Sequence, residues 1–186
     1  MNHDGVINAS DKVDLGNGLP KYTFGFNFSL AWKGFDLSAN FTGAAGFQIA
    51  QSYRDPSSSQ ANYSRRILKR WTGEGTSNEI PRVTYGDVGN WLFSDLYLQD
   101  GDYIRLQNLT MGYDFKKLIS WKGLSKMRLY FQVQNLFTLT KYDGMDPEIG
   151  SFNGTDGNSS DSWVSGVDMG YYPHPRTFIV GLNLAF

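Results

Sequence analysis

The 186-residue sequence contains no cysteine, which excludes disulfide frameworks and metal sites built from thiolates. It has only two histidines, His3 and His174, and neither has a partner at the spacing of a zinc site. The formal net charge is −1, so the chain as a whole has no basic field to attract nucleic acid or anionic lipid. No apolar run is as long as a membrane-spanning helix, but that excludes helical spans only, because barrel strands carry a much weaker hydropathy signal.

Two further absences concern secretion and catalysis. The opening residues 1–5 are polar, so no signal peptide begins the chain; an outer-membrane protein needs one, and under that interpretation the chain is a piece of something longer. No glycine-rich phosphate loop follows a predicted strand, and no enzyme is expected. Asp146 and Glu148 are the carboxylate pair that a glycosidase would use, but Pro147 between them favours an extended turn.

What the chain does have is a β-rich composition, with 16% aromatic residues and 21 glycines beside frequent Asn, Ser and Asp. Apolar and polar side chains alternate with the period of two that strands require. The cleanest alternation ends at a two-residue turn, Lys33-Gly34, and resumes after it, which predicts a tight hairpin. The five predicted strands span 21–32, 35–42, 102–115, 127–140 and 176–186.

Two of these strands depart from strict alternation. In the third, Ile104 and Leu106 share one phase, whereas the apolar residues that follow share the other: Leu109, Met111, Tyr113 and Phe115. The slip near Gln107 predicts either a bulge or a change of face where the strand leaves a membrane. In the fourth strand only Asn135 interrupts the apolar phase.

The connections between the predicted strands alternate between short and long. Residues 33–34 and 116–126 are short links, while 44–101 and 141–175 are long and rich in Gly, Ser, Asn, Asp and Pro. Membrane barrels have short periplasmic turns and long extracellular loops, so this pattern places the short links and Phe186 in the periplasm. In a compact soluble domain, loops this long would count against the assignment.

The predicted fold is all-β: an antiparallel meander of about five strands that forms the C-terminal portion of a transmembrane β-barrel with long extracellular loops. Single-chain membrane barrels start at about eight strands, and an open edge in lipid leaves unpaired backbone groups at a cost of several kcal/mol each. Residues 1–186 are therefore interpreted as one C-terminal fragment of a larger barrel, without a plug domain or the earlier strands.

A secreted carbohydrate-binding β-sandwich is the alternative that composition leaves open. The two interpretations differ in where one set of apolar side chains lies. In a sandwich the set packs together across a closed core, and in a barrel it lines one continuous outer surface. The set consists of Phe24, Phe26, Phe28, Phe41, Leu129, Phe131, Phe178 and Leu182.

Several stretches carry further patterns in a fixed order that covers most of the chain. They are the triplets Arg70-Trp71-Thr72 and Ile80-Pro81-Arg82 and the segments 4–11, 19–26, 94–113, 134–148 and 172–186. In residues, order and spacing these stretches resemble the C-terminal barrel region of the SusC/RagA family of TonB-dependent outer-membrane transporters.

The resemblance implies a setting larger than this chain. Such proteins are barrels of about 22 strands with an N-terminal plug and a segment that contacts TonB. They pair with a SusD-like surface lipoprotein and import oligosaccharides or peptides across the outer membrane of a Gram-negative bacterium. The resemblance thus implies a part in nutrient uptake, contact with outer-membrane lipid, and a link to the TonB complex through regions absent from this sequence. Alone, the chain is not expected to transport anything.

Residues near the start match part of a calcium-binding loop. Oxygen ligands at alternate positions, with Gly5 at the sharp turn, are what a hard cation requires. The first ligand position would precede Met1, and the last ligand is Asp rather than the usual Glu, so a polar surface turn is the alternative. The candidate calcium ligands are Asn2, Asp4, Val6 through its carbonyl, Asn8 and Asp11, and no other cofactor is predicted.

Two sets of loop residues are candidates for contacts with other molecules. A basic stretch beside Trp71 predicts a short amphipathic helix that docks on the lipoprotein, or alternatively a solvated basic face over a packed Trp. Loop aromatics could stack on sugar rings, although such residues more often fasten loops or lie in an interfacial girdle. The basic candidates are Arg65, Arg66, Lys69 and Arg70, and the ligand candidates are Tyr85, Trp91, Trp163, Tyr171 and Tyr172.

Overall fold

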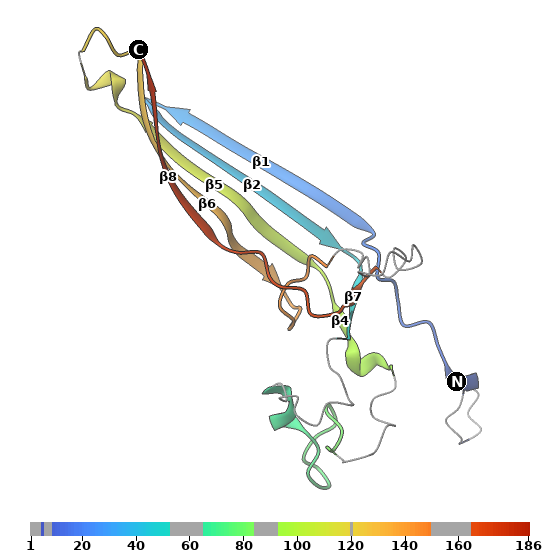
Figure 1. The fold of residues 1–186 in the computed structure, drawn as a ribbon. Coiled ribbons are helices and arrows are strands. Elements are labelled where there is room, and N and C mark those ends of the chain that lie inside the picture. The colour runs from blue at the N-terminus through green and yellow to red at the C-terminus, as the bar shows by residue number, and fades with distance from the viewer. Residues whose placement is uncertain (1–4, 6–8, 53–64, 84–92, 120, 150–164) are drawn as a thin grey trace, which may run out of the picture.

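The computed structural model describes residues 5, 9–52, 65–83, 93–119, 121–149 and 165–186. Its main feature is one five-stranded antiparallel sheet, which forms the long ribbons of Figure 1. The strands follow one another across the sheet in chain order, which confirms the predicted meander. They are β1 (Tyr22–Trp32), β2 (Phe35–Ala45), β5 (Tyr103–Asp114), β6 (Lys126–Thr140) and β8 (Thr177–Ala185).

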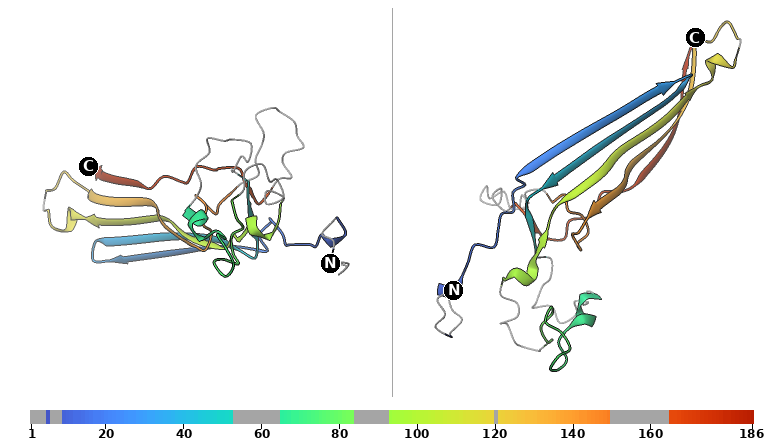
Figure 2. Two further views of the ribbon diagram at one scale, coloured as in Figure 1. Left: turned by 90° about the horizontal axis from the view of Figure 1, so that it is seen from below. Right: turned by 180° about the vertical axis from the view of Figure 1, so that it is seen from behind.

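The two ends of this sheet carry different structures. We call the end with the Lys33-Gly34 turn, the β5–β6 link and Phe186 the turn end, and the opposite end the loop end (Figures 1 and 2). Lys33 has a φ of 48° and Gly34 a φ of 97°, the left-handed backbone that a two-residue type I′ turn needs at both positions. These two residues join β1 to β2, so the predicted hairpin is confirmed. The β5–β6 link begins with a 3₁₀ helix, η5 (Phe115–Lys117).

A bulge in β5 keeps the apolar side chains on one face of the sheet. Phe41 of β2 pairs with Leu106, but the preceding β2 residue, Asn40, pairs with Asn108, so Gln107 is an extra residue in β5. The apolar residues on either side of Gln107 therefore share a face although their sequence phases differ. The predicted bulge is confirmed, and the alternative of a change of face is wrong.

Strand β6 has its own irregularity at the matching place. Asn135, which interrupts the apolar phase, has a left-handed φ of 51°. Its side-chain amide donates a hydrogen bond to the carbonyl of Pro175 at 3.1 Å. The pairing of β6 with β8 ends one residue earlier, at Gln134 and Thr177, so Asn135 satisfies a backbone group just beyond the end of that ladder.

The apolar face of the five-stranded sheet is uncovered. Phe178 is 61% exposed and Val180 is 72% exposed. The eight apolar residues that separate a barrel from a sandwich all fall on this face by strand register, and none of them is buried. In the views of Figure 2 the sheet is a single layer over the described ranges. The eight apolar residues therefore form one outer surface, as the barrel interpretation predicts, and not the core of a sandwich.

A second, three-stranded sheet lies at the loop end, within stretches that the sequence predicted to be loops. Its central strand β3 (Gln48–Gln51) pairs antiparallel with β4 (Leu98–Asp100) and parallel with β7 (Val167–Asp168). A small buried cluster joins it to the large sheet and consists of Ala44, Phe47, Ile49 and Tyr142, with Tyr103 and Ile149 packed against it. We call residues 46–52, 94–102, 141–149 and 165–176 the cap.

Three more 3₁₀ helices complete the described elements: η1 (Ala9–Asp11), η2 (Arg65–Lys69) and η4 (Asp95–Tyr97). All are five residues or shorter. Within the described ranges, no helix combines the length and the apolar character needed to cross a membrane.

Candidate functional site

The second face of the large sheet is polar and carries an uncharged central region. Strand register places Asn27, Asn40, Asn108 and Gln134 side by side in one row that crosses four strands. The next row toward the turn end consists of Ser29, Ser38, Thr110 and Gln132. These amides and hydroxyls offer both donors and acceptors to whatever fills the space in front of this face.

A buried arginine lies on the same polar face near the loop end. Arg105 is only 2% exposed, and its Nε donates to the hydroxyl of Thr138 on the neighbouring strand at 2.9 Å. Its Nη2 contacts Asp146 Oδ1 at 2.5 Å, and its Nη1 contacts Glu148 Oε2 at 2.7 Å. Because Arg105 belongs to β5, the loop after β6 must fold back over the polar face to reach it.

Asp146 is the second centre of this arrangement. Its Oδ2 accepts the backbone N–H of His174 at 3.1 Å and lies 3.0 Å from the His174 ring Nδ1, while its Oδ1 also accepts the N–H of Glu148 at 2.9 Å. Burial raises the pKa of Asp146, but the hydrogen bonds from His174, Glu148 and Arg105 outweigh burial and lower the pKa below its ordinary value. The carboxylate therefore stays charged and paired. We call Arg105, Asp146, Glu148 and His174 the arginine cluster.

The arginine cluster is an ion-pair site rather than a metal centre. Asp146, Glu148 and His174 do bring ligand atoms within 4.8 Å of one another, as a bound cation would require. The Arg105 guanidinium already contacts all three, at distances of 2.5 to 3.0 Å, and supplies the positive charge there. A metal ion would have to displace it and leave a buried guanidinium without its partners.

A second buried carboxylate fastens the cap from the other side. Asp168 is 0% exposed; its Oδ2 accepts the hydroxyl of Tyr142, and its Oδ1 accepts the N–H groups of Gly170 and Tyr171 at 2.8 and 3.1 Å. Its backbone carbonyl accepts the Ser52 N–H at 2.8 Å. The two long connections are thus joined to each other as well as to the sheet.

The turn end of the polar face holds a further ion pair. Arg128 on β6 reaches across β5 to Asp36 on β2, with Nε to Oδ1 at 2.8 Å. Gly112 makes this crossing possible, because a Cβ there would lie 2.6 Å from the guanidinium. Likewise the ring of Tyr130 lies over Gly181 of β8, where a Cβ would lie 2.2 Å from the ring.

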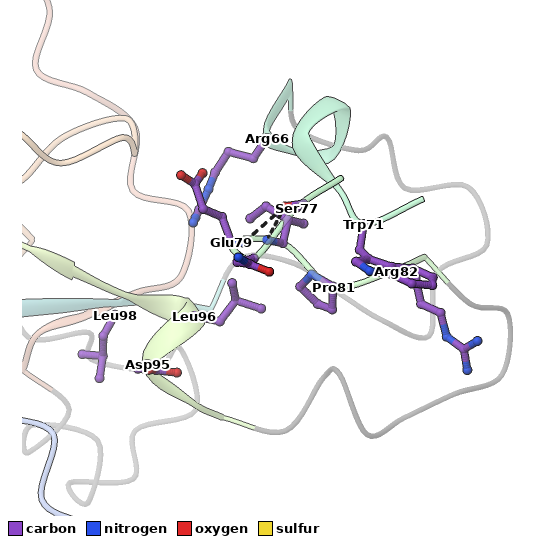
Figure 3. A pocket seen from close by; sticks show the side chains of 11 residues that line it. Arg66, Trp71, Ser77, Glu79, Pro81, Arg82, Asp95, Leu96 and Leu98 are labelled. Carbon is purple, nitrogen blue, oxygen red and sulfur yellow. Dashed lines mark hydrogen bonds between the residues drawn. The ribbon is translucent and has the colours of Figure 1, made fainter. Parts of the chain in front are cut away.

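An open groove lies beyond the cap, between the segment 65–82 and η4. It encloses about 850 Å³ and is lined by Trp71, Ile80, Pro81, Leu96, Leu98 and several polar residues (Figure 3). Arg66 and Glu79 extend toward the same side of the groove, while the guanidinium of Arg82 points away from it (Figure 3). The Trp71 N–H donates to the Ile80 carbonyl at 2.8 Å and fixes the two walls of this segment together.

No protein-family model matches the sequence. Known proteins do match it. TonB-dependent receptor P3 of Formosa agariphila is 35% identical over 188 residues, which cover 100% of this chain and 18% of the receptor. TonB-dependent receptor SusC of Bacteroides thetaiotaomicron is 29% identical over 189 residues, which cover 100% of this chain and 17% of SusC.

Solved structures give the same fold. One chain of the RagAB peptide importer in its closed-closed state superimposes with a TM-score of 0.67 at 22% identity, covering 98% of this chain and 20% of that chain. The open-open state of the importer gives a TM-score of 0.66 at 23% identity, covering 90% of this chain and 17% of that chain. This chain belongs to the SusC/RagA family of TonB-dependent outer-membrane transporters.

As a SusC/RagA sequence, the chain spans less than a fifth of the length of the curated relatives named above. The large sheet is accordingly an open segment of the barrel fold, with β1 and β8 at its two edges. The resemblance given by the sequence patterns is confirmed, and so is the all-β antiparallel fold.

The predicted docking residues of this SusC/RagA segment lie in and directly after η2. Arg65, Arg66 and Lys69 lie in η2, a 3₁₀ helix with no buried side chain rather than a packed amphipathic helix. Arg66 lines the groove of Figure 3, and Arg70 Nη1 donates to the Ile67 carbonyl at 3.2 Å. Docking of these residues on a lipoprotein stays a prediction.

The ligand and calcium candidates are described only in part. Tyr171 is half-buried beside Asp168, and Tyr172 is 87% exposed. Asp11 ends the short helix η1. The other candidates lie outside the described residues: Tyr85, Trp91, Trp163, Asn2, Asp4, Val6 and Asn8. Calcium and sugar binding therefore stay predictions.

Sequence reasoning missed the arginine cluster although it named three of its members. It interpreted Asp146 and Glu148 as a turn and gave His174 no partner, and it did not single out Arg105. The signal in the sequence was that Arg105 is the one charged residue between Tyr103 and Tyr113, in the polar phase of its strand.

Proposed function

We propose that this chain forms the C-terminal part of the wall of a TonB-dependent nutrient importer in the outer membrane of a Gram-negative bacterium. In this proposal the remaining strands and the plug come from other parts of a longer protein. One observation carries it: a single apolar face runs in register through all five strands, across the bulge, with no layer packed on it in the described ranges.

Water is a poor solvent for such a face and a bilayer is a good one. Soluble monomers rarely expose contiguous apolar patches larger than a few hundred Å². Lipid would cover the apolar face, while the polar face with its amide row would line the lumen. The free edges of β1 and β8 would pair with strands elsewhere in the barrel, because unpaired backbone groups are not tolerated in hydrocarbon.

The cargo and the partners are proposed from the relatives. Oligosaccharides and peptides are the proposed cargo, supported by the similarity to SusC and by the peptide named for the RagAB importer. A SusD-like lipoprotein at the outer surface and TonB at the inner side are the proposed partners, as for the relatives. The loop end, with its cap and the groove of Figure 3, would face the lipoprotein.

A glycosidase is not proposed. The relatives are receptors, and both carboxylates of the Asp146 and Glu148 pair are engaged by Arg105. A glycosidase needs one carboxyl group that is protonated and able to donate. The lowered pKa of Asp146 favours the opposite state.

Paired substitutions on β1 test the proposal in a full-length transporter that contains this segment. Phe28→Arg should cost about 2–4 kcal/mol if the side chain lies at the bilayer midplane, and should reduce both the heat-resistant folded form and uptake of labelled oligosaccharide or peptide. Asn27→Arg, one residue away on the polar face, is the matched control and should leave the folded form intact. Equal losses for both variants would contradict the proposal, as would normal uptake with Phe28→Arg.

A further inference from the structure

An apolar groove crosses the exposed face of the sheet at its turn end. It encloses about 700 Å³ and is lined by Leu30, Ala31, Trp32, Phe35 and Tyr113. Trp32, Phe35 and Tyr113 pair in one register row, so the groove lies over β1, β2 and β5, inward from the free edge of β1. The groove is open to its surroundings, and its walls are almost entirely apolar.

A lysine marks the water-facing end of this groove. Lys33 follows Trp32 directly, and its left-handed backbone in the type I′ turn sets the direction of its side chain. Its ammonium nitrogen lies 5.0 Å from the centre of the Trp32 ring, on the same face as the groove. Lys33 is exposed, and within the described part of the chain no carboxylate pairs with it.

The two links at the turn end are basic, which the net charge of the full chain conceals. The two links 33–34 and 115–126 together contain five lysines and no carboxylate: Lys33, Lys116, Lys117, Lys122 and Lys126. The nearest strand carboxylates are engaged. Asp36 pairs with Arg128 on the polar face, and Asp114 accepts the N–H groups of Lys116 and Met127 at 2.9 and 3.4 Å.

We propose that this groove binds one acyl chain of an anionic glycerophospholipid whose phosphate pairs with Lys33. An apolar trough at the border of an apolar band suits hydrocarbon, and a lysine at its wet end suits an anionic headgroup rather than a zwitterionic one. Indole and phenol rings at the same level suit the interface between hydrocarbon and water. The inference rests on the proposed membrane setting and adds a lipid-selective site to it.

The test uses the full-length transporter purified in detergent and native mass spectrometry with added lipid. Phosphatidylglycerol and phosphatidylcholine with identical acyl chains are the two probes. We expect phosphatidylglycerol adducts to exceed phosphatidylcholine adducts. Lys33→Asn should reduce the phosphatidylglycerol excess by about five-fold, which corresponds to about 1 kcal/mol for one lysine at an anionic headgroup. Asn suits a left-handed turn position, so this variant should fold normally.

Lys21→Asn is the matched control, because Lys21 is also exposed and borders the same strand at its loop end. It should leave the phosphatidylglycerol excess unchanged. Equal adducts for the two lipids, or equal effects of the two substitutions, would overturn the lipid site, as would dimers in place of lipid adducts. Failure of the proposed barrel-wall function would look different from failure of the lipid site. It would appear as loss of the heat-resistant folded form, which is measured on the same samples without added lipid.

Discussion

The large sheet and the cap use similar side chains in opposite ways. Most aromatic and aliphatic residues of the sheet are exposed on one face, whereas most side chains of its polar face are half-buried and Arg105 is buried. The cap buries Phe47, Ile49 and Tyr142 in the cluster that joins it to the sheet, and its buried Asp146 pairs with Arg105 of β5. The cap therefore has buried contacts that stabilise it, whereas in the proposed barrel the sheet would be covered by lipid and by further strands.

The strongest test of this contrast removes Arg105, the cation that β5 supplies to the cap. Arg105→Met would leave Asp146 buried without its guanidinium partner, which should destabilise the cap by about 3–5 kcal/mol. Hydrogen exchange in the full-length protein should rise in residues 141–149 and 165–176 and stay unchanged in β1.

Lys141→Met is the control for that substitution. Lys141 pairs with Asp100 at 4.0 Å with a side chain that is 87% exposed, and the loss of such a surface pair should cost about 0–1 kcal/mol. Similar exchange in the two variants would mean that the arginine cluster does not hold the cap.

The pH dependence of the cap gives a second, smaller effect. The pKa of Asp146 is lowered in the folded cap, so its contribution is complete above the ordinary carboxyl pKa of about 3.9 and is lost as the pH falls below that value. Protease cleavage of the cap should therefore accelerate as the pH is lowered through this range, measured with an acid-stable protease. In Asp146→Asn this acceleration should be largely absent; an unchanged pH profile would assign it to other groups.

The smallest expected effect concerns the turn end of the sheet. The rings of Trp121 and Phe186 meet edge to face with centroids 6.2 Å apart, and both are exposed. Trp121→Ala should cost about 0.5–1.5 kcal/mol, and Trp121→Phe should retain most of the contact. Hydrogen exchange at the end of β8 is the measurement. Equal protection in all three proteins would show that the strand ladder alone holds Phe186.

Local patterns predicted the sheet because its strands are long enough to show a period. Eleven residues of β1 alternate without interruption, and the Lys33-Gly34 turn has the chemistry of its turn type. Even the bulge at Gln107 was visible, since a shift of phase within one strand leaves few explanations.

The cap could not be predicted in the same way. Strands β3, β4 and β7 have four, three and two residues, too few to establish a period, and β3 pairs with β7 across more than half the chain. The arginine cluster joins residues from β5, from the loop after β6 and from the segment before β8. Nothing local to Asp146 or His174 indicates that Arg105 lies between them.

In the proposed barrel one face of the sheet meets lipid and the other meets the lumen, and β5 with its bulge is the sharpest place to measure this orientation. Spin labels at single cysteines in a reconstituted full-length transporter report collisions with oxygen in lipid and with a nickel chelate in water. We expect lipid exposure at Ile104 and Leu106 and then, after the bulge, at Leu109 and Met111, with water exposure at the intervening Asn108 and Thr110. An uninterrupted even–odd alternation through Gln107, or no alternation, would exclude this orientation of the two faces.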